Sequence, residues 1–187
     1  MISIRRARPG DAAAIGAVHV AVWQTTYAGV LPQNYLSGLS ALRLGAFYQR
    51  AVSDRRDAHA VFVAVAGDVA AGEEPQVVGF ASGGRARRAG LAEGEIETLY
   101  LLDDHRECGT GRRLMRAMGA HLRAVGCGSA LVWVLRDNPS RWFYQRLGGR
   151  PAAREVIKVA GQPVEQMAFV WDPIESLLSA TAPAREG

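Results

Sequence analysis

Residues 99–112 combine the residue types and the spacing that bind a phosphate group. An apolar segment runs into a loop that holds Gly109 and Gly111, and a helical pattern follows at once. Glycines let the main chain approach a ligand closely, and the first turn of a helix offers free N–H groups at the positive end of its dipole. Arg106 and Arg112 add positive charge on either side of the loop. The segment is expected to hold a phosphate or pyrophosphate, although a plain strand-to-helix turn would use the same glycines.

Spacing excludes several better-known motifs. A dinucleotide-binding fingerprint needs a third glycine where Leu114 stands, and the Gly-Lys-Ser/Thr sequence of a P-loop is missing. No Gly-x-Ser-x-Gly nucleophile elbow occurs. The histidines at positions 19, 59, 105 and 121 lack metal-ligand spacing, and His19 and His121 fit packed or solvated helix faces. No bound metal is expected.

Strand and helix patterns surround this segment and must position it. Apolar alternation and β-branched runs predict strands at residues 1–5, 61–65, 77–82, 95–102 and 130–135, and a hairpin at 155–159 and 164–171. Helices are expected after Asp11, which can cap the first of them, after the glycine loop, and at 139–147. One further helix is expected to open at Pro32 and to carry both Leu36 and Tyr48. This order of elements predicts a mixed α/β domain.

Length and composition fit one globular domain. The chain has 187 residues, 49% of them hydrophobic, and 22 basic against 18 acidic residues give a net charge of +4. That excess suits a patch for an anionic ligand but is too small and too scattered for nucleic-acid binding. We expect a single domain over residues 1–172, with residues 173–187 forming a C-terminal tail.

The cysteine pattern and the apolar segments indicate in which cellular compartment the protein is expected. Cys108 and Cys127 form neither a metal pattern nor a disulfide framework, which favours a reducing cytoplasm. Residues 12–42 carry no Asp, Glu, Lys or Arg, but polar residues and Pro32 interrupt them well short of a membrane span. The arginines before this stretch are followed by a good helix start, so a signal peptide is not expected. We therefore expect a cytoplasmic protein with no membrane partner.

Several motifs, taken in order, resemble the GNAT superfamily of acyl-CoA-dependent N-acetyltransferases. That family shows a strand, an Arg/Gln-x-x-Gly-x-Gly/Ala loop and then a helix, and residues 106–111 match this pattern. Downstream, the family has an Asn followed by Phe-Tyr-x-x-Leu-Gly, which residues 138–148 match. The Arg-rich start with Pro9-Gly10-Asp11 is also typical. The resemblance covers roughly residues 2–171.

The resemblance implies a fold and a cofactor. The fold is an α/β domain with a twisted, mostly antiparallel sheet, a splayed central pair of parallel strands and helices on both faces. The cosubstrate is acetyl-CoA, whose thioester would lie in the gap between strand 95–102 and strand 130–135. The implied cofactor-binding residues are Leu99, Tyr100 and Leu101 of the central strand, Arg106, Glu107, Cys108, Gly109, Thr110, Gly111 and Arg112 of the loop, and Asn138.

The reaction of this family explains which side chains carry chemistry. An alkylamine with a pKa near ~10.4 must lose a proton before it attacks a thioester, so a carboxylate base is useful. Glu95 and Glu97 are the candidates and share a strand face, because side chains alternate along a strand. The resemblance favours Glu95, which stands where several family members keep a catalytic Glu. Tyr144 occupies the family position of the general acid. The alternative is that both carboxylates face solvent and that Tyr144 only packs in the core.

The acceptor side is less closely defined. Trp23 and Tyr27, together with Tyr35 and Tyr48, are expected to wall the acceptor site. Residues 12–53 contain no Asp or Glu, which argues against a polycationic acceptor. A small amine, an amino-acid derivative and a peptide N-terminus all remain open, and the final hairpin offers a possible homodimer contact.

Two features leave alternatives open. Glu107 and Cys108 stand where the family loop usually carries basic residues, so a non-catalytic acyl-CoA-binding domain is the alternative to an enzyme. Cys108 is either a thiol activated by the helix N-terminus or a small filler. The arginines at positions 85, 87 and 88 either meet the CoA phosphate or an acidic substrate, or lie in a solvated loop.

Overall fold

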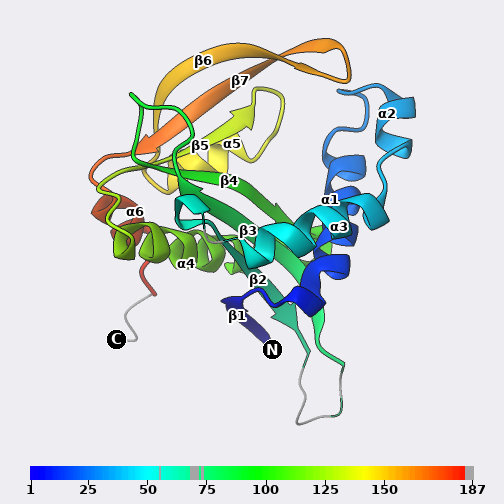
Figure 1. The fold of residues 1–187 in the computed structure, drawn as a ribbon. Coiled ribbons are helices and arrows are strands. Elements are labelled where there is room, and N and C mark those ends of the chain that lie inside the picture. The colour runs from blue at the N-terminus through cyan, green and yellow to red at the C-terminus, as the bar shows by residue number, and fades with distance from the viewer. Residues whose placement is uncertain (55, 68–71, 73, 184–187) are drawn as a thin grey trace.

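The computed structural model of the 187-residue chain describes every residue except 55, 68–71, 73 and 184–187. In the described part, one sheet runs through the molecule with helices on both faces (Figure 1). Its seven strands lie in the order β1-β2-β3-β4-β5-β7-β6. Their bounds are Ile2–Arg6 for β1, Ala60–Ala66 for β2, Gln76–Arg85 for β3, Gly94–Leu101 for β4, Ala130–Leu135 for β5, Arg150–Val159 for β6 and Gln162–Trp171 for β7.

Neighbouring strands pair antiparallel except for the parallel pair β4 and β5. This confirms the expected fold class. The helices are α1 at Ala12–Thr26, α2 at Gln33–Ser37, α3 at Ala41–Ser53, α4 at Thr110–Ala124, α5 at Arg141–Arg146 and α6 at Glu175–Ala180. Short 3₁₀ turns lie at Pro9–Asp11, Arg56–Ala58 and Asp103–His105. No helix in the described part of the chain has the length and apolarity that crossing a membrane requires.

The predicted single helix after Pro32 is wrong, because the structure has two helices there. Gly38 ends α2, and Ser40 begins α3 by accepting a hydrogen bond from the Arg43 amide at 3.3 Å. A serine at this position satisfies one of the free N–H groups of a first helical turn, so it starts a new helix. The sequence therefore contained a cap signal that the apolar pattern obscured.

The predicted cap by the Asp11 side chain is also wrong. Asp11 stands at the start of α1, but its carboxylate accepts hydrogen bonds from Arg5 at 2.7 and 2.9 Å and from the Arg8 amide at 2.7 Å. The Arg5 guanidinium holds the pKa of this carboxyl below its ordinary value. The guanidinium on β1 takes this carboxylate because it offers two parallel N–H donors and a full positive charge, whereas a cap offers a main-chain N–H with only a partial charge.

Two hydrophobic clusters lie on opposite faces of the sheet. On one face, α1 and α3 pack on β2 and β3 through residues such as Ile15 and Tyr48. On the other face, α4 packs on the sheet through residues such as Met115 and Met118. This second cluster includes Leu177 of α6, so the chain from 173 to 180 packs against α4. The residues beyond 183 lie outside the described part.

The central strands separate, and the separation begins at one point. β4 and β5 pair only over three residues of β4, from Gly94 to Ile96, and β4 then continues to Leu101 with no partner on that side. At the same point the register between β3 and β4 shifts, so that Glu97 has no opposing residue in β3. Such a bulge adds one residue to a strand, increases its twist and redirects its side chains. The expected splay between these strands is confirmed.

A third cluster closes the far end of this gap. Tyr27 and Leu31 after α1 and Leu36 of α2 pack against Leu135 of β5 and Val164 of β7. Figure 1 shows the same arrangement, with α2 approaching the tip of the β6–β7 hairpin. The gap between the separated strands is therefore enclosed by α1 and α2 on one side and by the hairpin on the other.

Candidate active site

Two clefts meet where β4 and β5 separate. The first, which we call the glycine-loop cleft, has a volume of about 520 Å³ and lies between the β4–α4 loop and α5. The second, the carboxylate cleft, has a volume of about 260 Å³ and lies between β4, β5 and the β6–β7 hairpin. Four residues line both clefts and so mark their junction: Tyr27, Leu99, Tyr100 and Asn138.

The glycine-loop cleft ends at the first turn of α4. Gly109 precedes that turn with φ of 80°, a left-handed conformation that glycine adopts without strain. Gly111 lies against the ring of Phe143 from α5, where a Cβ would come within 3.4 Å of that ring. Glu107 also has a positive φ, of 60°, and lines the cleft. The loop therefore presents main chain and a helix N-terminus to the cleft.

Cys108 and Thr110 of this loop do not line the cleft. The Cys108 thiol donates to the His105 carbonyl at 3.0 Å and lies 3.2 Å from the Thr110 hydroxyl. The hydrogen bond with Thr110 lowers the pKa of the Cys108 thiol. Only the main chain of these two residues is in a position to contribute to a cradle for a phosphate.

The two arginines of the loop are held differently. Arg106 Nε donates to the Leu101 carbonyl at 3.2 Å, and its guanidinium also contacts Thr26 and Asp103. Arg112 donates through one terminal nitrogen to the Ala182 carbonyl. Its buried Nε has no hydrogen-bond partner in the described part of the chain. A buried N–H without a partner is costly, which makes this atom a candidate donor to a ligand in the cleft.

Glu95 lies in the carboxylate cleft and is paired with Arg87. Arg87 Nη2 donates to Glu95 Oε1 at 3.0 Å, and the Arg87 amide donates to Oε2 at 3.3 Å. The Glu95 side chain is only 11% exposed, whereas that of Arg87 is 68% exposed. Both carboxylate oxygens of Glu95 therefore already receive donors from one partner at the mouth of the cleft.

Glu97 lines the same cleft with looser contacts. Its Oε2 lies 3.5 Å from His59 Nε2, and its Oε1 lies 3.7 Å from Arg87 Nε. The His59 imidazole lowers the pKa of the Glu97 carboxyl, and the carboxylate in turn raises the pKa of His59. The expected common face of Glu95 and Glu97 is present, because both carboxylates lie against the one guanidinium of Arg87.

Tyr144 of α5 lines the carboxylate cleft from the opposite wall. Its side chain is buried against Phe169 and Trp171, and burial raises its pKa well above the ordinary value for tyrosine. The hydroxyl is therefore protonated throughout the physiological pH range. The cleft thus brings together a neutral hydroxyl and two carboxylates.

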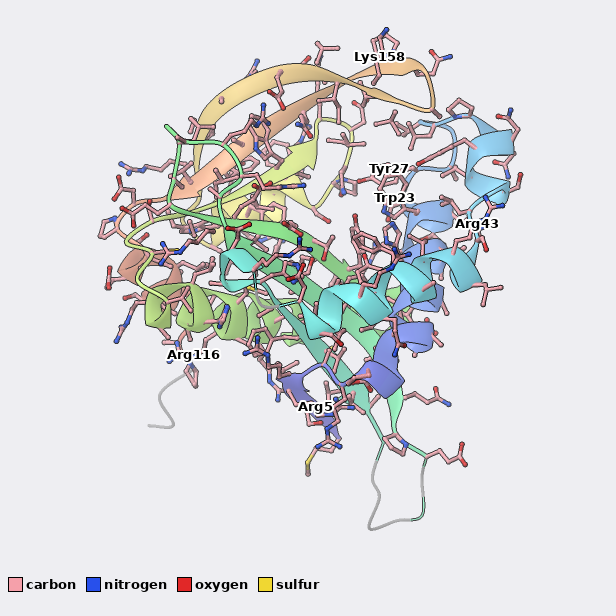
Figure 2. The ribbon with its side chains drawn as sticks, in the orientation of Figure 1. Arg5, Trp23, Tyr27, Arg43, Arg116 and Lys158 are labelled. Carbon is pink, nitrogen blue, oxygen red and sulfur yellow. The ribbon has the colours of Figure 1, made fainter. Side chains whose placement is uncertain are left out.

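A hydrogen bond spans the junction of the two clefts. Asn138 Nδ2 donates to the Tyr27 hydroxyl at 2.9 Å, and Asn138 Oδ1 accepts from the Ser140 amide at 2.8 Å. Figure 2 shows Trp23 and Tyr27 near the C-terminal end of α1, on the side that faces the sheet. Trp23 lines the carboxylate cleft, and its buried indole N–H has no hydrogen-bond partner among the described residues.

Other aromatic and cationic residues differ from expectation. Tyr35 and Tyr48 do not line either cleft, because Tyr35 packs on the edge of Trp23 and Tyr48 is buried in the core beside His19. Arg87 and Arg88 line the carboxylate cleft, whereas Arg85 donates to the Val125 carbonyl. None of the three arginines lines the glycine-loop cleft, so they do not meet a phosphate bound there.

Sequence reasoning missed three residues of the carboxylate cleft or its surroundings. The sequence pattern indicates of His59 only that it lacks metal-ligand spacing, and the expectations for the acceptor side include neither Trp133 nor the Tyr100 side chain. Arg88 stacks on the Trp133 ring at 5.2 Å and pairs with Glu155 of β6 at 2.7 Å. The alternation of β5 contained a signal for Trp133, since it places this side chain toward the gap.

Comparisons with known proteins decide the family. The model of the FR47-like protein family matches residues 77–157, which include the separated strand, the glycine loop and α5. The N-acetyltransferase YuaI of Bacillus subtilis, itself uncharacterized, is 31% identical over 179 residues, covering 95% of this chain and 96% of that protein. The chain belongs to the GNAT family of N-acetyltransferases. This GNAT protein is accordingly an acyltransferase.

Solved structures agree on the fold of this GNAT protein. The PaiA N-acetyltransferase of Thermoplasma acidophilum, solved with coenzyme A, matches with a TM-score of 0.65 and 16% identity over 89% of this chain and 98% of that one. YncA of Salmonella typhimurium, solved with acetyl-CoA, matches with a TM-score of 0.65 and 20% identity over 99% of both chains. The GNAT fold therefore extends across almost the whole chain.

Proposed function

We propose that this GNAT protein transfers the acetyl group of acetyl-CoA to a primary amine by direct attack in a ternary complex. The single observation that carries the proposal is the meeting of the two clefts at the separated strands. The glycine-loop cleft suits a phosphate-bearing cosubstrate, and the carboxylate cleft holds acid and base side chains. Bound coenzyme in two structural relatives, PaiA and YncA, supports the same cosubstrate.

The residues of the glycine-loop cleft fit acetyl-CoA. The pyrophosphate would be held by the main chain of residues 107–112 and by the unpartnered Nε of Arg112. The pantetheine arm would lie along the edge of β4 that has no partner strand from residue 97 to Leu101. Asn138 would contact it at the junction. When bound, acetyl-CoA supplies an acetyl thioester as the group to be transferred.

Replacement of Arg112 by Lys tests this cradle. Lysine keeps the positive charge but lacks the buried Nε–H, so the Kd for CoA should rise by roughly tenfold or more, the size of one hydrogen bond to a charged group. Titration calorimetry measures this change. Arg116→Lys is the matched control, because Arg116 lies one turn later on α4 and donates to the Leu178 carbonyl outside the cleft. Equal affinities for the two variants would contradict the assignment of Arg112.

The carboxylate cleft would prepare the acceptor and serve the leaving group. An ammonium bound beside Glu95 and Glu97 is electrostatically favoured and must lose a proton before it becomes a nucleophile. An N–H of the unpaired β4 edge near Leu101 would stabilise negative charge that develops on the acetyl oxygen. Tyr144, held neutral by burial, would donate its proton toward the thiolate. The hydrogen bond from Asn138 to the Tyr27 hydroxyl would confine the reacting groups at the junction of the two clefts.

The size of the carboxylate cleft favours a small acceptor. A volume of about 260 Å³ suits a small amine or an amino-acid derivative better than an extended chain, although a peptide N-terminus would also reach the junction. Trp23, Tyr27 and Trp133 line it, so an acceptor with an apolar body would bury that surface. The cleft carries cationic Arg87 and Arg88 beside its two carboxylates, which does not favour a polycation.

Calorimetric titration with acetyl-CoA and with CoA, followed by a thiol-release screen over a panel of amines, tests the proposal. Micromolar binding together with thiol release for an amine is the expected result. Binding with no release from a broad panel would favour a non-catalytic acyl-CoA-binding role. Failure to bind either compound would contradict the proposed cosubstrate and would indicate that Glu107 and Cys108, which replace the usual basic residues of the loop, have abolished the phosphate cradle.

A further inference from the structure

His59 is a partly buried histidine whose position has no use in the proposal so far. It stands just before β2, and its side chain is only 16% exposed. The register explains how it comes beside Glu97, which lines the carboxylate cleft. Ala60 pairs with Gly83, and Gly83 pairs with Ile96, so the start of β2 lies beside the bulged part of β4.

A glycine makes this approach possible. A Cβ at Gly84 would lie 3.1 Å from the Cα of His59 and 2.7 Å from the Asp57 carbonyl oxygen. A side chain at that position would therefore push the segment before β2 away from β4. With glycine there, His59 Nε2 comes to 3.5 Å from Glu97 Oε2.

The two ring nitrogens of His59 have separate tasks. Nδ1 lies 3.2 Å from the Ala51 carbonyl oxygen, which only accepts hydrogen bonds, so Nδ1 carries a hydrogen in either charge state. Ala51 belongs to the last turn of α3, where carbonyl groups lack helical partners and favour a nearby positive charge. The proton that His59 gains or loses therefore resides on Nε2, the atom that faces Glu97.

We propose that His59 is a positioning and proton-accepting residue for the acceptor amine, acting through Glu97. This inference rests on the proposed function. An N–H bond of the bound ammonium breaks, and its electron pair stays on nitrogen as the nucleophilic lone pair. The proton passes to a Glu97 carboxylate oxygen and from there to Nε2 of neutral His59. Glu97 returns to its carboxylate form, and the imidazolium later releases the proton to solvent.

The chemistry favours this pair over either carboxylate alone. An acid whose pKa is lowered by its partner is a poor match for an ammonium with a pKa near ~10.4, whereas an imidazole with a raised pKa is a closer match. Glu95 has both oxygens engaged by Arg87, which leaves Glu97 as the freer carboxylate. The separation of 3.5 Å between Nε2 and Oε2 is longer than an ordinary hydrogen bond, as catalytic hydrogen bonds often are before ligands bind.

The other charged groups around this pair are largely matched among themselves. Asp54 at the end of α3 favours the charged imidazole of His59, but Asp54 Oδ2 is itself paired with Arg56 Nη2 at 2.8 Å. Arg87 Nε lies 3.7 Å from Glu97 Oε1, whereas His59 contacts Oε2. The charged groups that face the pair or its main chain are Arg6, Asp54, Arg56, Asp57, Arg87 and Glu95. Glu97 remains the group in direct contact with Nε2.

A titration by NMR tests the pairing without any need for turnover. We expect one histidine, identified by its absence in His59→Gln, to titrate above the ordinary value of about 6.5 in the wild-type protein. In Glu97→Gln its pKa should fall, because the carboxylate that stabilises the imidazolium is lost. A His59 titration that is the same in wild type and Glu97→Gln would overturn the proposed pair.

Kinetics test the proton transfer. With an amine from the panel, kcat/KM for the wild type should fall at low pH along a limb set by His59, because protonated His59 accepts no further proton. In His59→Gln the rate at neutral pH should fall by about tenfold or more and that limb should vanish. His121→Gln is the matched control, since His121 is also a part-buried histidine bonded to a carbonyl, that of Ala58 at 2.7 Å, but unlike His59 it forms no ion pair with a carboxylate among the described residues.

The outcomes separate this inference from the function on which it rests. Identical pH profiles for His59→Gln and His121→Gln would overturn the role of His59 while leaving the acetyltransferase intact. A wild-type protein that binds acetyl-CoA but acetylates nothing would overturn the proposed function, and with it the proton transfer. The NMR titration would then still decide whether His59 and Glu97 titrate as a pair.

Discussion

Tyr144→Phe should lower kcat by at least about tenfold while the affinity for acetyl-CoA stays nearly unchanged. In the proposed mechanism this hydroxyl donates the proton to the leaving thiolate, and such transfers typically contribute about 10²–10⁴-fold. The binding of the cosubstrate is spared because Tyr144 lines the carboxylate cleft and not the glycine-loop cleft. Steady-state thiol release and calorimetry on the same protein measure the two quantities.

The matched control is Tyr35→Phe, which removes the hydroxyl of a tyrosine whose ring packs against Trp23 but which lines neither cleft. It should keep the wild-type kcat. Unchanged turnover in Tyr144→Phe would reject Tyr144 as the general acid. A parallel loss of acetyl-CoA affinity would instead indicate that its hydroxyl supports the cofactor site.

Trp171→Ala should lower the free energy of unfolding by about 3–5 kcal/mol, the range for removing a large aromatic side chain from a core. Trp171 is fully buried at the end of β7, and its indole N–H donates to the Leu147 carbonyl at 2.7 Å. The substitution leaves both a cavity and an unpaired buried carbonyl, so the two costs add. Urea unfolding followed by circular dichroism gives the difference.

Trp142→Ala provides the comparison for that experiment. Trp142 lies on α5 with 52% of its surface exposed and stacks with the Arg141 guanidinium. Its loss should change the free energy of unfolding by no more than about 0.5 kcal/mol, as for most surface substitutions. Similar losses for the two tryptophans would contradict the position of Trp171 in the core.

Local patterns made most of the fold predictable. Strand 130–135 is where alternation and β-branched residues place it, and the glycine loop and the helix after it carry signals within a few residues. The errors arose where a polar side chain had two options. The Asp11 carboxylate pairs with Arg5 of β1 instead of capping α1. Ser40 caps a second helix within a stretch whose apolar pattern predicts a single helix. Arg5 is close in the sequence but belongs to a separate strand, and the apolar pattern around Ser40 is stronger than its cap signal, so local patterns alone do not predict either outcome.

In the candidate site, too, some residues can be predicted from their order in the sequence, whereas others depend on tertiary contacts. The loop residues and the two carboxylates could be located because they follow one another along the chain. The pairing of His59 with Glu97 requires the register of three strands and a bulge, and none of these can be read from spacing. The involvement of Arg87 likewise depends on how the β3–β4 loop folds back over the strand that follows it.

The limited overlap of the two clefts has a consequence for how this protein can change. Among the described residues, only Tyr27, Leu99, Tyr100 and Asn138 line both clefts. The β4 edge at the junction offers main-chain N–H groups that no substitution other than proline removes. Side chains such as Trp23, Arg88 and Trp133 can therefore vary without loss of the cosubstrate. We therefore expect a new acceptor to be acquired through substitutions at such positions, while the residues that line the glycine-loop cleft stay unchanged.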